Sequence, residues 1–173
     1  MIQRRLAMLC LTAALAGCNE DPHITNLSRH LIVFGDPAPP VTADTVMIVE
    51  IHGLPWDGST PDEVANTMKM PEGPARTARF VAVAPGEAQI GGAERLVFQF
   101  NPPGPIDSVA ICQAKGPLEV EEPDGDGFTV NAVYCREGEW LIQARMTSSA
   151  AKLDWVTYHL AMEKLLGKMF EVQ

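Results

Sequence analysis

The sequence predicts an α+β domain with a mostly antiparallel sheet, one short helix and a long C-terminal helix. Three observations lead to this class. Short runs rich in β-branched residues are separated by Gly and Pro. One segment carries a complete signal for a helix N-terminus, and the last segment has apolar residues at spacings of three and four. Because the order is strand, helix, several strands, helix, we expect the helices to pack on one face of the sheet.

The first strand and the short helix have the clearest local signals. Residues 45–51 read Thr-Val-Met-Ile-Val-Glu-Ile and the run ends at Gly53, which predicts a buried strand. Thr60 is a suitable N-cap, Pro61 suits the first helical position, and Glu63 completes a capping box. We expect this helix to run to about Met68, ahead of two prolines that end it.

The middle of the chain predicts a series of strands joined by turns. Residues 78–84 and 95–100 are expected to form a hairpin across a Gly-rich connection. Further strands are expected at residues 108–113, 118–121, 128–135 and 140–146, with 118–121 pairing with 128–135 across the turn 124–127.

The chain closes with an amphipathic segment, residues 150–170, that predicts a long helix. Its large apolar residues recur every three or four positions, which places them on one face that we assign to the core. They are Trp155, Tyr158, Met162, Leu165 and Met169.

The first eighteen residues have the features of an export signal. Arg4 and Arg5 precede an apolar run, residues 6–14, that is too short to span a bilayer. The run ends in Leu-Ala-Gly-Cys, with the cysteine at Cys18. This combination resembles the signal and lipobox of bacterial lipoprotein precursors.

The resemblance implies diacylglycerol on the sulfur of Cys18, cleavage before that residue, and usually a third acyl chain on the freed amine. Such an anchor holds without help from other membrane contacts, because two chains already suffice. By the same resemblance, Asn19 favours the outer membrane over the inner. The expected organisation is a signal peptide at 1–17, a lipidated proline-rich tether at 18–42 and a single domain at 43–173.

The net charge of the chain restricts the partners that it can bind. Cleavage removes Arg4 and Arg5, so the mature 156 residues keep eleven Lys and Arg against 22 Asp and Glu, a net charge of −11. An acidic surface repels phosphate backbones and anionic head groups. We therefore expect no nucleic-acid partner, and a domain body that stands off the membrane to which its lipid attaches.

Two cysteines remain for the folded part, since Cys10 leaves with the signal and Cys18 carries lipid. In an oxidising periplasm Cys112 and Cys135 are expected to form a disulfide, which contributes about 3 kcal/mol for a loop of this length. Neither a Cys-x-x-Cys redox motif nor closely spaced zinc ligands accompany them.

Metal and cofactor motifs are weakly represented. Met68 and Met70, with His52 upstream, are candidate ligands for a soft ion such as Cu(I), although methionines more often fill gaps in a core. The run at residues 122–127 resembles the start of a calcium loop but lacks the acidic residue at position twelve. His159 and Glu163 share a helix face without further ligands. We assign no metal and no cofactor.

Catalytic motifs are equally sparse. His52, Asp57 and Ser59 lie close together in one polar stretch, whereas the members of a working triad usually come from separate elements. Glu50, Asp57 and Glu63 are the clustered carboxylates that a hydrolase of envelope polymers would need. The sequence thus favours a non-enzymatic, lipid-anchored envelope protein that faces the periplasm and binds a protein partner or supports an assembly. The alternative is a periplasmic domain that binds copper or a small ligand.

Overall fold

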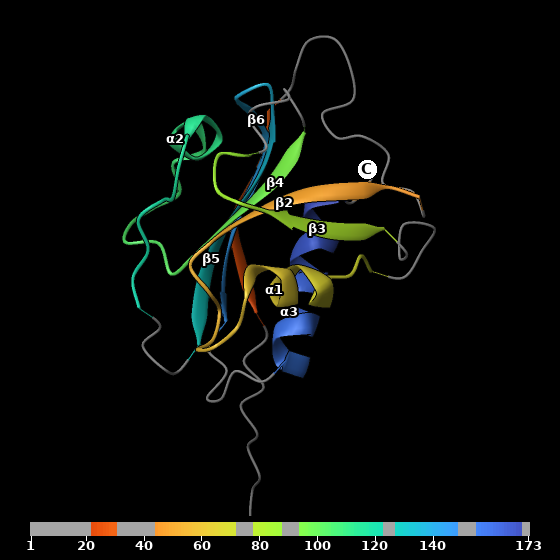
Figure 1. The fold of residues 1–173 in the computed structure, drawn as a ribbon. Coiled ribbons are helices and arrows are strands. Elements are labelled where there is room, and N and C mark those ends of the chain that lie inside the picture. The colour runs from red at the N-terminus through yellow and green to blue at the C-terminus, as the bar shows by residue number, and fades with distance from the viewer. Residues whose placement is uncertain are drawn as a thin grey trace, which may run out of the picture.

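The computed structural model describes residues 22–30, 44–71, 78–87, 94–122, 127–148 and 155–170. In these residues six strands form one mixed sheet in the order β1-β6-β5-β4-β2-β3, accompanied by three helices (Figure 1). The α+β class is confirmed. The elements in chain order are β1 His23–Arg29, β2 Val46–His52, α1 Pro61–Thr67, β3 Arg79–Val83, β4 Arg95–Phe100, α2 Ser108–Gln113, β5 Phe128–Arg136, β6 Glu139–Ser148 and α3 Trp155–Phe170.

Strand pairing is antiparallel from β1 through β6 and β5 to β4, while β2 is parallel to both β4 and β3. The predicted hairpin between residues 78–84 and 95–100 is therefore wrong, because β2 lies between the two strands. The helix α1 provides the crossover that returns the chain as a parallel strand. The long connection from β3 to β4 then allows the chain to pass β2.

The N-terminal part corrects the predicted tether at residues 18–42. Residues 23–29 form β1, an edge strand paired with β6, so this part of the tether belongs to the folded domain. Ile24 packs against the core, and the Arg29 side chain donates hydrogen bonds to the carbonyls of Lys168 and Met169 at the end of α3. The remainder of the tether, apart from Pro22 and His30, lies outside the described residues.

The segment 108–113, predicted as a strand, is the helix α2. The Asp107 carboxylate accepts a hydrogen bond from the backbone N–H of Ala110 at 3.0 Å, which caps the helix. Ile111 and Cys112 then face the sheet together. The predicted strand at 118–121 is also wrong: these residues form no strand, and β5 pairs with β4 and β6 instead.

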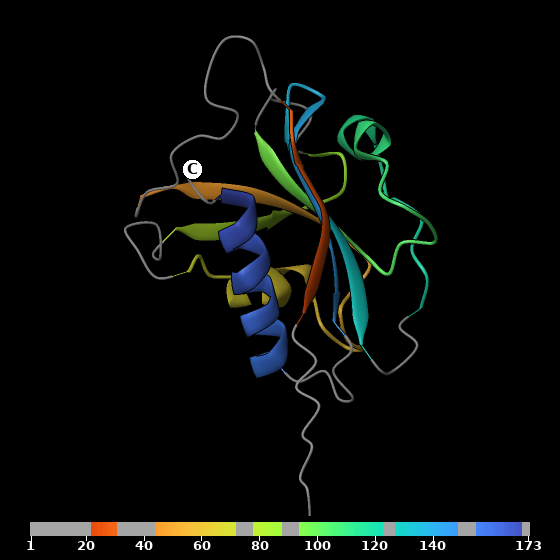
Figure 2. The same ribbon diagram turned by 180° about the vertical axis from the view of Figure 1, so that it is seen from behind.

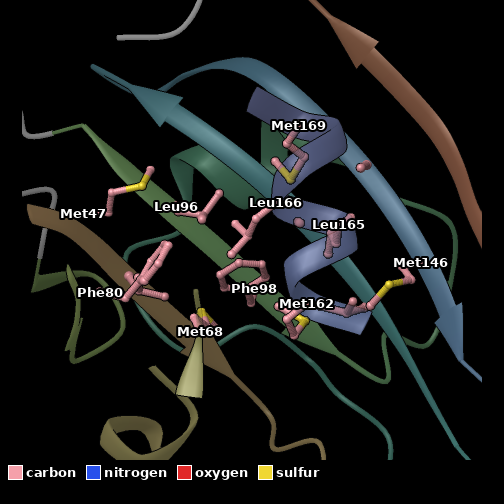
Figure 3. Close-up of a cluster of buried hydrophobic side chains, with 14 of the residues drawn as sticks. Met47, Met68, Phe80, Leu96, Phe98, Met146, Met162, Leu165, Leu166 and Met169 are labelled. Carbon is pink, nitrogen blue, oxygen red and sulfur yellow. The ribbon is translucent and has the colours of Figure 1, made fainter. Parts of the chain in front are cut away.

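The main core lies between the sheet and the helices α1 and α3, which cover one face (Figure 2). Figure 3 shows side chains of β2, β3, β4, β6 and α3 meeting there. The predicted stripe on α3 is confirmed for Tyr158, Met162, Leu165 and Met169, all fully buried. The capping box of α1 is confirmed too, with the Thr60 N–H 2.9 Å from the Glu63 carboxylate.

A smaller apolar cluster lies on the opposite face, beneath α2. The prediction that all helices share one face is therefore wrong. Covering both faces buries all six residues of β4, from Arg95 to Phe100. Within the described residues, no helix combines the length and apolarity needed to cross a bilayer.

Candidate functional site

The face of the sheet beneath α2 carries a row of polar side chains. Successive strand residues point to opposite faces, so each strand places alternate residues there. The register aligns one such residue from each of five neighbouring strands. We call this set the polar row: His52 of β2, Gln99 of β4, Asn131 of β5, Arg145 of β6 and Thr25 of β1.

Hydrogen bonds connect the centre of the polar row. The Asn131 amide donates to the Gln99 side-chain oxygen at 3.1 Å, and Arg145 donates to the Asn131 side-chain oxygen at 3.1 Å. Gln99 and Asn131 are each at least 90 % buried. Their amides therefore need partners inside the protein, and each supplies one to the other.

A buried ion pair lies beside the row. Nε of Arg95 is 3.2 Å from a carboxylate oxygen of Glu50, and neither side chain is more than 2 % exposed. The contact lacks the alignment of a hydrogen bond, so charge attraction joins the two groups. The pair arises because Glu50 lies opposite Val97 in the sheet, two residues beyond Arg95 on the same face.

His52 completes this group. Its Nδ1 accepts a hydrogen bond from the backbone N–H of Leu118 at 3.0 Å, so the imidazole proton is carried by Nε2. That nitrogen lies 3.7 Å from the second carboxylate oxygen of Glu50. The three side chains form a buried cluster, the Glu50–Arg95–His52 cluster, in which one carboxylate faces two nitrogen-bearing groups.

The same side chains hold the long connection between β4 and β5 against the sheet. Arg95 donates to the carbonyl of Cys112 at 2.7 Å, and Gln99 donates to the carbonyl of Glu119 at 2.8 Å. Arg145 donates to the carbonyl of Gly104 at 2.6 Å. With the Leu118 bond to His52, four sheet residues satisfy backbone groups of a connection that has little regular structure of its own.

A disulfide fixes the same connection covalently. The Cys112–Cys135 disulfide, predicted from the sequence, is confirmed, and it joins α2 to β5. Both cysteines are fully buried among Val97, Ile111 and Val133. The Cys112 carbonyl also accepts the hydrogen bond from Arg95, so Cys112 is held both by the disulfide and by the buried arginine.

The candidate copper ligands do not converge. Met68 and Met70 are buried in the main core on the face covered by α1 and α3, whereas His52 points to the opposite face and bonds with Leu118. The buried methionines are Met47, Met68, Met70, Met146, Met162 and Met169, which are all the methionines after residue 17. They fill the core in the manner of flexible, polarizable side chains (Figure 3).

The residues considered for catalysis are also separated. Asp57 is exposed, and the Ser59 hydroxyl donates to the carbonyl of Trp56 at 2.8 Å within its own loop. Glu63 is engaged in the helix cap, while Glu50 is buried with Arg95. The structure thus brings Glu50 and His52 together, but without the serine or a second carboxylate.

His159 and Glu163 on α3 have a structural role. Nδ1 of His159 donates to the carbonyl of Thr67 at the end of α1 at 2.8 Å, and its Nε2 lies 3.7 Å from the Glu163 carboxylate. The histidine therefore links α3 to α1. In the part of the chain that the structure describes, no three His, Cys, Asp or Glu side chains gather as metal ligands would.

Sequence reasoning missed Arg95, Gln99, Asn131 and Arg145. The signal was present as polar residues at alternate positions of apolar strands, most clearly where Arg95 and Gln99 flank Val97. Such alternation normally marks a solvated face. The helix α2 and its flanking loops cover this face instead, which only the tertiary structure reveals.

Cys18, the expected lipidation residue, lies outside the described residues. Comparisons with protein-family models, with curated proteins and with solved structures find no match to this chain.

Proposed function

We propose that this chain is a lipid-anchored, non-enzymatic protein of a bacterial cell envelope, which faces the periplasm and binds an extended segment of another envelope protein. Lipid on Cys18 anchors it, and Asn19 favours the outer membrane. The observation that carries the anchor is the sequence Leu-Ala-Gly-Cys after a basic start and a short apolar run.

The use of the buried polar groups supports a binding role over catalysis. In the described residues the Glu50–Arg95–His52 cluster is at most 3 % exposed, and the neighbouring polar side chains bond to the backbone of the β4 to β5 connection. Catalytic groups must reach a substrate, whereas these groups hold a covering segment in place. Their role is structural, because they hold the β4 to β5 connection against the sheet.

The binding surface we favour is the outer edge of β3. In the described residues β3 pairs only with β2, so its other side offers backbone groups to an added strand. Val81 of β3 and Val46 of β2 lie on the same face of this edge and are 42 % and 43 % exposed. An extended segment with uncharged β-branched or aromatic residues on one side suits this surface.

The opposite edge is less suited to strand addition. The strand β1 has an irregular register between Thr25 and Ser28, and Asn26 has a positive φ of 52°. Bulges of this kind twist an edge away from regular pairing.

Site-specific photocrosslinking in intact cells tests this function. A benzophenone amino acid replaces Val81, and the matched control replaces Val109, which is 52 % exposed on α2 and remote from the β3 edge. We expect a discrete protein adduct from position 81 that is absent from position 109 and lost in Cys18→Ser. Equal adduct patterns at both positions would refute the binding surface. Intact mass without acyl chains on Cys18 would refute the anchor.

A further inference from the structure

The exposed side of α3 carries an unusual stripe for an acidic protein. Val156, Leu160, Lys164 and Lys168 are four residues apart in succession, and all four are exposed. Residues at this spacing lie on one face of a helix. We call them the outer stripe of α3. Leu160 is 60 % exposed and Val156 is 46 % exposed.

The outer stripe differs in charge from the whole molecule. The mature chain has a net charge of −11, yet the stripe contains two lysines and no acidic residue. Glu163, which flanks it, is only partly exposed and lies beside His159. Aliphatic residues next to lysines suit the boundary between acyl chains and anionic head groups, because the lysine stem is apolar and its amine reaches the phosphates.

The expected anchor places this helix near the membrane. Cys18 is five residues before His23, the first residue of β1. Consecutive Cα atoms are about 3.8 Å apart, so the chain between these residues spans at most about 19 Å. This distance is less than the length of α3, whose 16 residues extend about 24 Å at 1.5 Å each.

The strand β1 begins at the same end of the molecule as α3. Both start at the lower end in Figures 1 and 2. Arg29 at the far end of β1 bonds to the carbonyls of Lys168 and Met169 at the far end of α3, so the two elements run side by side in the same direction. A lipid attached just before β1 therefore lies close to the first turns of α3, where Val156 and Leu160 are exposed.

We propose that the outer stripe of α3 is a membrane-contacting surface that lies on an anionic phospholipid bilayer, with Val156 and Leu160 at the acyl boundary and Lys164 and Lys168 at the phosphates. This inference rests on the proposed lipid anchor. From its acidity we expected the domain body to stand off the membrane; in this proposal the domain instead lies on the membrane in a defined orientation. The helix α2, on the opposite face of the sheet, points away from the bilayer and the β3 edge remains accessible to a partner.

Depth-dependent fluorescence of the intact lipidated protein tests this orientation. Leu160→Cys is labelled with the fluorophore NBD and reconstituted into vesicles of phosphatidylethanolamine and phosphatidylglycerol, with quencher-labelled lipids. Val109→Cys on α2 is the matched control, and Val156→Cys is a second test position if labelling at 160 perturbs folding. We expect a blue shift and strong quenching at 160 or 156 and neither at 109. Lys164→Glu combined with Lys168→Glu should reduce the quenching.

The outcomes separate the two proposals. If the protein carries acyl chains and sediments with vesicles, yet positions 156 and 160 are no more quenched than 109, the orientation is wrong and the anchor stands. Self-association through the stripe, seen as quencher-independent blue shifts that depend on protein concentration, also overturns the orientation. If no acyl mass is found and the protein stays in solution, the anchor is wrong and the orientation fails with it.

Discussion

The Glu50–Arg95 ion pair offers the sharpest test of how the face beneath α2 is held. Arg95→Leu removes the guanidinium whose Nε lies 3.2 Å from the Glu50 carboxylate, and it also removes the hydrogen bond to the Cys112 carbonyl. Because both partners are at most 2 % exposed, the remaining charge has no water to solvate it. Breaking a buried pair in this way costs about 3–5 kcal/mol.

This cost is a large part of the total stability, which for a domain is about 5–15 kcal/mol. For a chain of this size each kcal/mol lowers Tm by about 2–4 °C, so we expect a fall of about 6–20 °C. Urea and thermal unfolding, followed by circular dichroism on the Cys18→Ser protein, measure both quantities. The reference is Cys18→Ser with Arg95 intact.

Two further variants decide the reasoning. Arg79→Leu removes an exposed arginine of β3 and should change the free energy of unfolding by no more than about 0.5 kcal/mol. Glu50→Leu combined with Arg95→Leu should recover much of the loss, since no uncompensated charge is left buried. A loss below about 1 kcal/mol for Arg95→Leu, typical of a surface pair, would refute the account. A double variant that is no more stable than Arg95→Leu alone would refute it too.

Three other perturbations test separate parts of the fold. Replacing Cys112 and Cys135 with alanine should lower the free energy of unfolding by about 3 kcal/mol in urea, and an unchanged midpoint would contradict the closure of the 23-residue loop. Thr60→Ala should lower it by about 1 kcal/mol through loss of the α1 cap, so equal stability would argue against the capping box. Burial raises the pKa of Tyr134 and Tyr158, the two tyrosines of the chain, above the ordinary 10. The folded state therefore holds these protons more tightly, and this contribution is complete below pH 10 and lost as the pH rises further. Absorbance at the tyrosinate band should appear only together with unfolding; tyrosinate in a still folded protein would be inconsistent with this burial.

The sequence predicted correctly those elements whose formation depends on residues close together in the chain. The capping box at Thr60 predicts α1 because both of its hydrogen bonds are made within one turn. The apolar spacing of α3 predicts its buried face, since a helix repeats every 3.6 residues whatever it packs against. The disulfide was predictable because Cys112 and Cys135 are the two cysteines of residues 43–173.

Short apolar runs were ambiguous for a physical reason. The six residues of α2 suit a strand or a helix equally well, and the Asp107 cap together with packing on the sheet selects the helix. The strand β1 has few apolar residues, so its sequence looked like a tether. The strand forms because its backbone pairs with β6, and the pattern of its side chains does not indicate this pairing.

The sequence by itself determined the α+β class, the helix α1, the amphipathic helix α3 and the cysteine pair. The helices depend on residues that are near in sequence, and the cysteine pair follows because residues 43–173 contain two cysteines. Only the tertiary structure decided the strand order, the parallel position of β2 between β3 and β4, and the burial of Glu50, Arg95 and His52 together. These features depend on contacts between residues tens of positions apart, such as Arg95 with Glu50 and Leu118 with His52. The same alternation of polar and apolar residues would describe a face open to water, and the covering helix α2 is what turns that face into a second core.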